Sequence, residues 1–137
     1  MVPPACYQNF SGLFGPQRQP DGSVGWVLPV DPTVRCLHMG DINELGDIVA
    51  GAFTHPEETG NGASLPLVGD FLSFNELFST LNQLGHRFSF RQVPREVYAS
   101  FFPGADAQSE TLAYYETFTY LGPGSHEEQM ALADQVA

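Results

Sequence analysis

The chain has 137 residues, 42% of them hydrophobic, and a formal net charge of −11, which predicts one folded domain rather than a disordered segment. Its basic residues are five arginines, and it contains no lysine. A nucleic-acid binder needs a cationic surface, an anionic membrane would repel the chain, and lysine-dependent chemistry is excluded. No apolar run is long enough to span a membrane, and two cysteines make no disulfide framework. We expect a cytoplasmic protein with no nucleic-acid and no membrane partner.

The first third of the sequence predicts mostly extended backbone. Residues 3–9 contain two prolines and favour an extended lead-in, and residues 10–22 predict a loop that ends in a turn. Short strands are expected at 24–29 and 33–39, with the spacing of a hairpin between them.

A helix, a loop and a strand are expected next. Apolar residues at helical spacing predict the helix over 42–54. Asp41 has the position of its N-cap, and Glu44 lies three residues later, as in a capping box. An acidic loop then leads to a strand at 63–68.

The second half of the sequence is richer in helical patterns. A capping box, Ser73 to Glu76, opens a helix that ends near Gly85. The elements expected after it are a strand at 86–93, a short helix from Pro94, a helix at 105–121, and a helix or mobile tail at 125–137.

This alternation of strands and helices predicts an α/β fold, with a small mixed sheet of short strands and four to five helices. We expect residues 1–137 to form a single domain, in which the tail, residues 122–137, is a separate helix or mobile.

Several short motifs occur in an order that resembles a known family. They are residues 4–10 (PACYQNF), the loop 16–22, residues 39–49 (MGDINELGDIV), 55–58, 67–70, 92–94 and 102–105. Across residues 3–121 the chain resembles the C-terminal half of the NmrA-like family, atypical relatives of the short-chain dehydrogenase/reductases. The resemblance implies a substrate-side domain without the Rossmann half that holds NAD(P) in full-length members.

No glycine-rich dinucleotide loop follows a strand in this sequence. We therefore expect no cofactor, and no metal either, because the histidines and cysteines lack ligand spacing. The surface that relatives bury against the Rossmann half would be exposed here, so we expect a homodimer or a complex with another chain.

Two functions are compatible with these features. The first is a cofactor-independent enzyme that binds a hydrophobic small molecule, which the resemblance implies is a secondary metabolite, and catalyses its isomerisation, cyclisation (possibly pericyclic) or dehydration. The second is a non-enzymatic regulator that keeps the protein-binding half of an NmrA-like protein and uses its acidic surface for a basic partner.

Three residues are candidates for catalysis. Alternation on the strand 33–39 places Val34, Cys36 and His38 on one face, so His38 is either a buried hydrogen-bonded histidine or an acid/base in a cavity. Tyr7 is a candidate because the resemblance places it beside the substrate cleft. Asp106 lies near the helix that roofs this cleft by resemblance, and its alternative role is a solvated helix face.

The candidates for substrate binding are mostly aromatic. An ordinary core is the alternative role for each ring, and the adjacent Tyr114 and Tyr115 cannot both face one core on a helix. The set is Asn9, Phe10, Trp26, Phe102, Tyr114, Tyr115 and Phe118.

Overall fold

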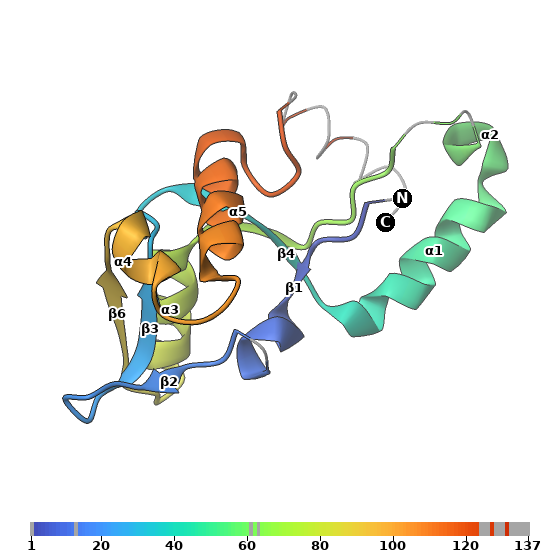
Figure 1. Ribbon diagram of the computed structural model, residues 1–137. Coiled ribbons are helices and arrows are strands. Elements are labelled where there is room, and N and C mark those ends of the chain that lie inside the picture. Colours follow the sequence, from blue (N-terminus) through green and yellow to red (C-terminus); the bar gives the residue numbers. More distant parts are fainter. Residues whose placement is uncertain are drawn as a thin grey trace.

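The computed structural model describes residues 2–12, 14–60, 62, 64–123, 127 and 131. Two three-stranded mixed sheets and five α-helices make up an α/β fold in the part described (Figure 1). The expectations for the tail, residues 122–137, fall almost entirely outside the described residues.

The first sheet has the order β1-β4-β5 and lies at the centre of the molecule. Strand β1 (Ala5–Cys6) runs parallel to β4 (Arg35–Gly40), and β5 (Asp70–Ser73) runs antiparallel to β4. The pairing of β4 with β5 shifts register between Arg35 and Leu37. Such a bulge bends a strand and interrupts the alternation of its side chains.

The second sheet has the order β2-β3-β6. Strand β2 (Gln17–Arg18) is antiparallel to β3 (Val24–Leu28), and β6 (Phe88–Gln92) is parallel to β3. Gly25 lets β6 approach closely, since a Cβ there would lie 1.9 Å from the carbonyl oxygen of Ser89.

Three helices pack around these sheets. They are α3 (Phe74–Gln83), α4 (Arg95–Ala99) and α5 (Ala105–Phe118). The capping box of α3 is complete: the Ser73 hydroxyl accepts the Glu76 N–H, and the Glu76 carboxylate accepts the Ser73 N–H. Gly85 follows this helix with a φ of 102°, as a C′ glycine does. The main core includes Trp26, Met39, Phe74, Phe78, Tyr98 and Leu112.

The segment after β4 projects away from this packed part (Figure 1). It consists of a 3-10 turn, η2 (Ile42–Glu44), followed by α1 (Leu45–Thr54) and α2 (Pro56–Thr59), and we call residues 42–59 the arm. Asp41 caps the turn by accepting the Asn43 N–H at 2.9 Å. The amide of Gln8 joins the same site, donating to the Asp41 carboxylate at 2.6 Å and accepting the Ile42 N–H at 3.3 Å.

Several expectations about the elements were wrong. The strands expected at 24–29 and 33–39 exist as β3 and β4 but belong to different sheets, so they form no hairpin. The strand expected at 63–68 is only an isolated bridge between Val2 and Pro66, and the true strand, β5, starts at Asp70. The acidic loop contains α2, and the loop 10–22 contains β2. The extended lead-in shortens to β1, because Tyr7–Ser11 form a 3-10 helix, η1.

Candidate functional site

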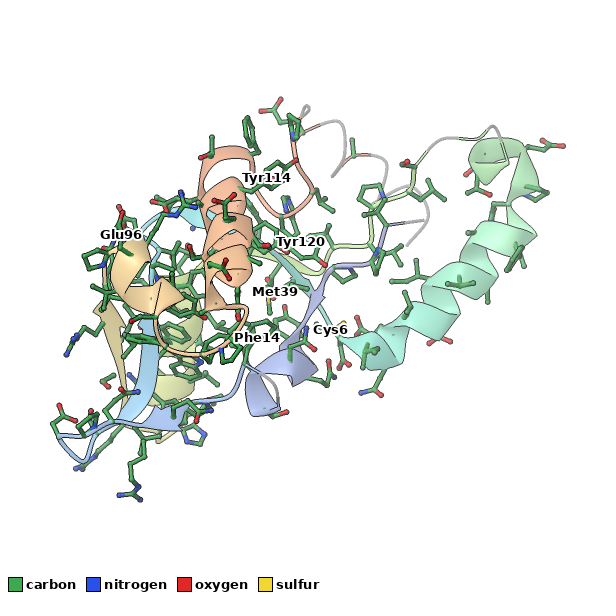
Figure 2. All side chains as sticks on the ribbon, viewed as in Figure 1. Cys6, Phe14, Met39, Glu96, Tyr114 and Tyr120 are labelled. Carbon is green, nitrogen blue, oxygen red and sulfur yellow. The ribbon has the colours of Figure 1, made fainter. Side chains whose placement is uncertain are left out.

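An apolar pocket of about 210 Å³ lies between the two sheets and α5. Strands β1, β3 and β4 supply aliphatic and aromatic side chains to it, while α5 and the segments around η1 close the remaining sides. We call it the Trp26 pocket, and its lining is Ala5, Asn9, Phe10, Phe14, Trp26, Leu28, Leu37, Phe74, Gln108, Thr111, Leu112, Tyr115 and Tyr120. Figure 2 shows Phe14 and Tyr120 close to α5.

Trp26 forms part of the wall of this pocket and is held in place by contacts on several sides. Its indole N–H donates to the carbonyl oxygen of Phe14 at 2.7 Å. One ring face stacks on Phe78, with centroids 4.1 Å apart and planes at 12°. Phe10 and Phe88 contact it edge-on. Stacked and edge-on arrangements are the favourable ones for aromatic pairs, so the indole forms a rigid wall.

Two phenols supply polar groups to the pocket. The rings of Tyr115 and Tyr120 lie 5.1 Å apart between centroids. Burial raises the pKa of both phenols. The neighbouring Tyr120 and then Cys36 raise the pKa of Tyr115 further, and Cys6 does the same for Tyr120. Both hydroxyls therefore stay protonated at neutral pH and can donate hydrogen bonds. The backbone N–H of Tyr120 donates to the Cys36 carbonyl at 2.8 Å, which holds this segment against β4.

Four of the seven residues proposed for substrate binding line the pocket: Asn9, Phe10, Trp26 and Tyr115. The other three lie outside its lining. Phe102 packs edge-on against Tyr98, while Tyr114 and Phe118 pack against each other, with 43% and 45% of their surfaces exposed. The two adjacent tyrosines thus face different surroundings, as helical geometry requires.

His38 is fully buried and stacks on Phe71, with the ring centroids 4.5 Å apart. It does not line the Trp26 pocket, although Leu37 beside it does. Alternation along β4 accounts for this placement, because adjacent residues of a strand face opposite sides. Burial also raises the pKa of the Cys36 thiol to about 12, which leaves it an unreactive core residue.

Tyr7 lies at the end of β1, where its hydroxyl donates a hydrogen bond to the Asp70 carboxylate. Burial raises the pKa of this phenol well above its usual range, and the hydrogen bond and charge of Asp70 raise it further. Tyr7 can therefore donate a proton or a hydrogen bond but cannot act as a base at neutral pH. Neither Tyr7 nor Asp106 lines the Trp26 pocket, and Asp106 is exposed in the first turn of α5.

The predicted substrate-binding set lacked five polar or aromatic residues that line this pocket: Gln108, Thr111, Tyr120, Phe14 and Phe74. A signal for the first two was present, because residues 108, 111, 112 and 115 have the spacing of one helix face. Tyr120 gave no such signal, because it follows the end of α5 at Phe118.

Within the described residues, no three His, Cys, Asp or Glu side chains are grouped so that they could hold a metal ion. Among the helices of that same part, none is long and apolar enough to cross a membrane.

The fold is similar to solved structures of NmrA, which is described as a negative transcriptional regulator. One such structure gives a TM-score of 0.70 at 22% identity over 98% of this chain. A complex of NmrA with NAD gives 0.71 at 21% identity over 98%, and a complex with NADP gives 0.65 at 23% over 86%. The present chain covers only 45%, 46% and 39% of those three chains, so it spans less than half of their length.

A comparison with curated proteins gives no match. The sequence pattern that defines the NmrA-like family, in contrast, matches residues 1–135, nearly the whole chain. The chain therefore belongs to the NmrA-like family.

Proposed function

We propose that this chain binds a small, mainly apolar molecule in the Trp26 pocket and acts on it by isomerisation or cyclisation, without a cofactor. The observation that carries the proposal is an apolar pocket with two protonated phenols, Tyr115 and Tyr120, in its wall. Binding sites for small molecules are typically apolar, with a few polar groups that fix the orientation of the ligand.

The size of the pocket limits the ligand. An apolar cavity of roughly 150 Å³ is large enough to bind benzene, and the Trp26 pocket measures about 210 Å³. It therefore suits one substituted ring rather than a fused polycyclic metabolite. The amides of Asn9 and Gln108 and the two phenols favour a ligand with a carbonyl or another hydrogen-bond acceptor.

The lining also limits the chemistry. The thirteen lining residues include no carboxylate, imidazole or guanidinium, so the pocket supplies donors but no strong base. Donors aimed at a carbonyl stabilise developing negative charge, and a shaped cavity holds a reactive conformer. Both effects support cyclisation or isomerisation, whereas dehydration would also need a stronger acid than a buried phenol.

A matched pair of α5 variants tests binding. Thr111 lines the pocket and Thr117 does not, yet both are exposed and their hydroxyls bond to backbone carbonyls four residues earlier. With a monocyclic aromatic ketone as the probe in ligand-observed NMR, Thr111→Trp should weaken binding at least tenfold, while Thr117→Trp should change it less than twofold. Equal affinities in the two variants, or no binding by the unaltered chain, would contradict the proposal.

Turnover needs a separate measurement. Bound ketones should be incubated with the chain and analysed by mass spectrometry and NMR for products of the same mass, the signature of isomerisation or cyclisation. Tyr115→Phe and Tyr120→Phe should each slow such a reaction, by roughly the hundredfold to thousandfold that the loss of one oxyanion donor produces. Binding without any product would mean that the chain binds the ligand but does not act on it as an enzyme.

The second candidate is a non-enzymatic regulator that binds another protein through the arm. The observation that favours it is an exposed apolar surface: Phe53 is 81% exposed and Ile42 is 50% exposed. Residues 41–59 also carry five carboxylates and neither lysine nor arginine, which suits a basic partner. This interpretation implies a homodimer or a complex with another chain at the arm, and sedimentation of the chain as a stable monomer would contradict the homodimer.

A further inference from the structure

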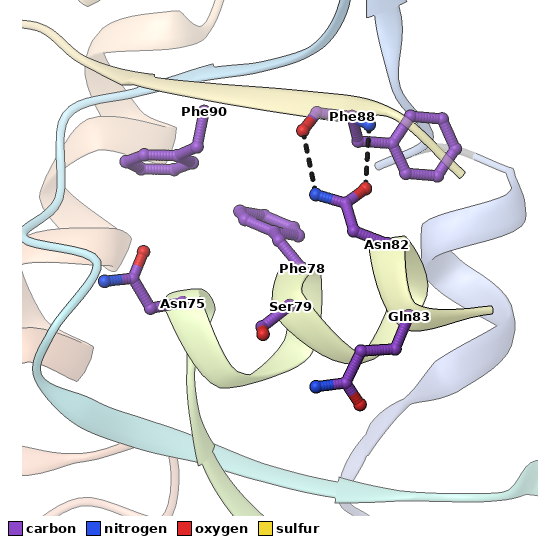
Figure 3. Close-up of a pocket in the computed structure, with 7 residues that line it drawn as sticks. All are labelled: Asn75, Phe78, Ser79, Asn82, Gln83, Phe88 and Phe90. Carbon is purple, nitrogen blue, oxygen red and sulfur yellow. Dashed lines mark hydrogen bonds between the residues drawn. The ribbon is translucent and has the colours of Figure 1, made fainter. Parts of the chain in front are cut away.

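A second hollow, of about 620 Å³, lies between α3 and β6, on a different part of the molecule from the Trp26 pocket (Figure 3). Its lining combines three phenylalanine rings with polar side chains of α3. We call it the β6 groove, and its lining includes Phe78, Phe88, Phe90, Asn75, Ser79 and Asn82. Strand β6 is an edge strand within the described residues, because β3 is its only neighbour there.

Asn82 already occupies part of this edge. Its side-chain oxygen accepts the backbone N–H of Phe88 at 2.8 Å, and its side-chain nitrogen donates to the Phe88 carbonyl at 3.1 Å (Figure 3). A residue on a neighbouring strand would bond to the same two groups. The amide of Asn82 therefore stands in for one residue of an additional strand.

The next backbone groups along this edge lie beyond the reach of this amide. The N–H of Val93, just after β6, donates to Leu28 on β3 at 3.1 Å. Backbone groups of alternate residues in a strand point to opposite edges, so Ser89 and Arg91 bond towards β3 as Val93 does. The N–H and carbonyl groups of Phe90 and Gln92 then point, like those of Phe88, to the open edge.

The charge at this edge is opposite to that of the chain as a whole. Residues 86–95 contain three of the five arginines and no carboxylate, in a protein with a net charge of −11. Arg95 is paired with Glu110 at 3.1 Å. Arg87 and Arg91, in contrast, are exposed and form no ion pair within the described residues.

We propose that the β6 groove binds an acidic, extended peptide segment of another protein as an added strand. The backbone of this peptide forms hydrogen bonds with the N–H and carbonyl groups of Phe90 and Gln92. An added strand would lie about 4.8 Å from β6. Its side chains would point alternately to the face of the sheet that carries Arg91 and to the face that carries Phe90. Carboxylates on the first face pair with Arg87 and Arg91, and small apolar residues on the other face contact Phe90 and Phe78. This mode of recognition is β-strand addition.

The first test uses a fluorescein-labelled peptide of four glutamates alternating with three valines, and fluorescence polarisation. Arg91→Glu should weaken its binding at least tenfold. The control is Arg18→Glu on β2, at the opposite edge of the same sheet, which changes the net charge equally and should weaken binding less than threefold. An equal loss in both variants would indicate general repulsion only and would overturn the proposal, as would the absence of binding.

The second test leaves the protein unaltered. Amides of alternate residues in a strand point to opposite edges, so only one series of peptide amides faces β6. Two peptides, one N-methylated at every valine and one at every second glutamate, should differ in affinity at least tenfold. Equal affinities would contradict strand addition, because a peptide held only by its charges would not distinguish them.

The third test concerns the competing occupant of the edge, a second copy of this chain. Sedimentation should show that any self-association of the chain is unaffected by the peptide. A dimer that the peptide dissociates, and that Arg91→Glu also disrupts, would mean that the edge is an interface between copies and would overturn the proposal.

Discussion

Helix α1 of the arm and helix α3 of the packed part have the same length, but the helix that is richer in apolar residues buries fewer of them. Helix α1 (LGDIVAGAFT) is mostly apolar, yet Ala52 is its only buried residue. Helix α3 (FNELFSTLNQ) is mostly polar, yet it buries Phe74, Leu77 and Phe78. The number of apolar residues therefore does not decide which helix enters the core.

The neighbours available to each helix explain the difference. In α3 the apolar residues form one stripe, and β6 and Trp26 cover it. In α1 the apolar residues also recur at helical spacing, but within the described residues the helix has its main contacts with η2 and α2, and Ala52 packs with Leu65. An apolar helix face is normally covered by another element, so we propose that another chain covers this one.

The largest expected effect is in the packed part. Trp26→Ala should reduce the free energy of unfolding by about 3–5 kcal/mol, as other large-to-small changes of buried aromatic residues do, because the indole contacts three phenylalanine rings and one carbonyl. Urea unfolding measures this. A loss below about 1 kcal/mol would mean that the ring is not a fixed wall.

The next largest effect on stability is expected from removing a helix cap, and it should differ between the two regions. Ser73→Ala removes the hydroxyl that accepts the Glu76 N–H at the start of α3 and should cost about 1–2 kcal/mol of global stability. Asp41→Ala removes the corresponding cap of η2. It should increase amide hydrogen exchange in the arm while changing global unfolding by less than about 0.5 kcal/mol. Equal global losses would show that the arm unfolds together with the packed part.

Tyr7→Phe removes the hydrogen bond that joins η1 to Asp70 of β5 within the packed part, and at neutral pH it should cost about 1 kcal/mol. The pKa of Tyr7 is higher in the folded chain than its ordinary value of about 10. Its stabilising contribution is therefore complete below pH 10 and declines as the pH rises further. Urea unfolding from pH 8 to 11 should show a shallower alkaline decline in Tyr7→Phe than in the unaltered chain. Parallel curves would disprove this coupling.

The smallest effect on stability is expected at the tip of the arm. Phe53→Ser should change the free energy of unfolding by less than about 0.5 kcal/mol, because the ring is 81% exposed. The same variant should reduce any self-association measured by sedimentation. A loss of stability above about 1 kcal/mol would place this ring in a contact within the chain instead.

Periodicity in the sequence predicted α3, β3, β6 and α5. The four pocket residues that were predicted came instead from the family resemblance, for Asn9, and from their aromatic character, for Phe10, Trp26 and Tyr115. Periodicity could not predict that β3 and β4 belong to separate sheets, because strand pairing depends on distant partners such as Ala5 and Phe88. Alternation separated His38 from Leu37, but it could not indicate that the pocket lies on the Leu37 side of β4. The role of Tyr120 depends on a backbone bond to Cys36, which local sequence does not encode.

The lining of the Trp26 pocket extends along the chain from Ala5 to Tyr120. During synthesis the first residues of this wall emerge from the ribosome more than a hundred residues before the last. Tyr120 completes the wall only after α5 has formed and the next turn has brought its N–H to Cys36. The ligand proposed above should therefore bind only after Tyr120 has been added to the chain, and a stop codon placed before residue 118 should remove that binding even where most of the fold survives.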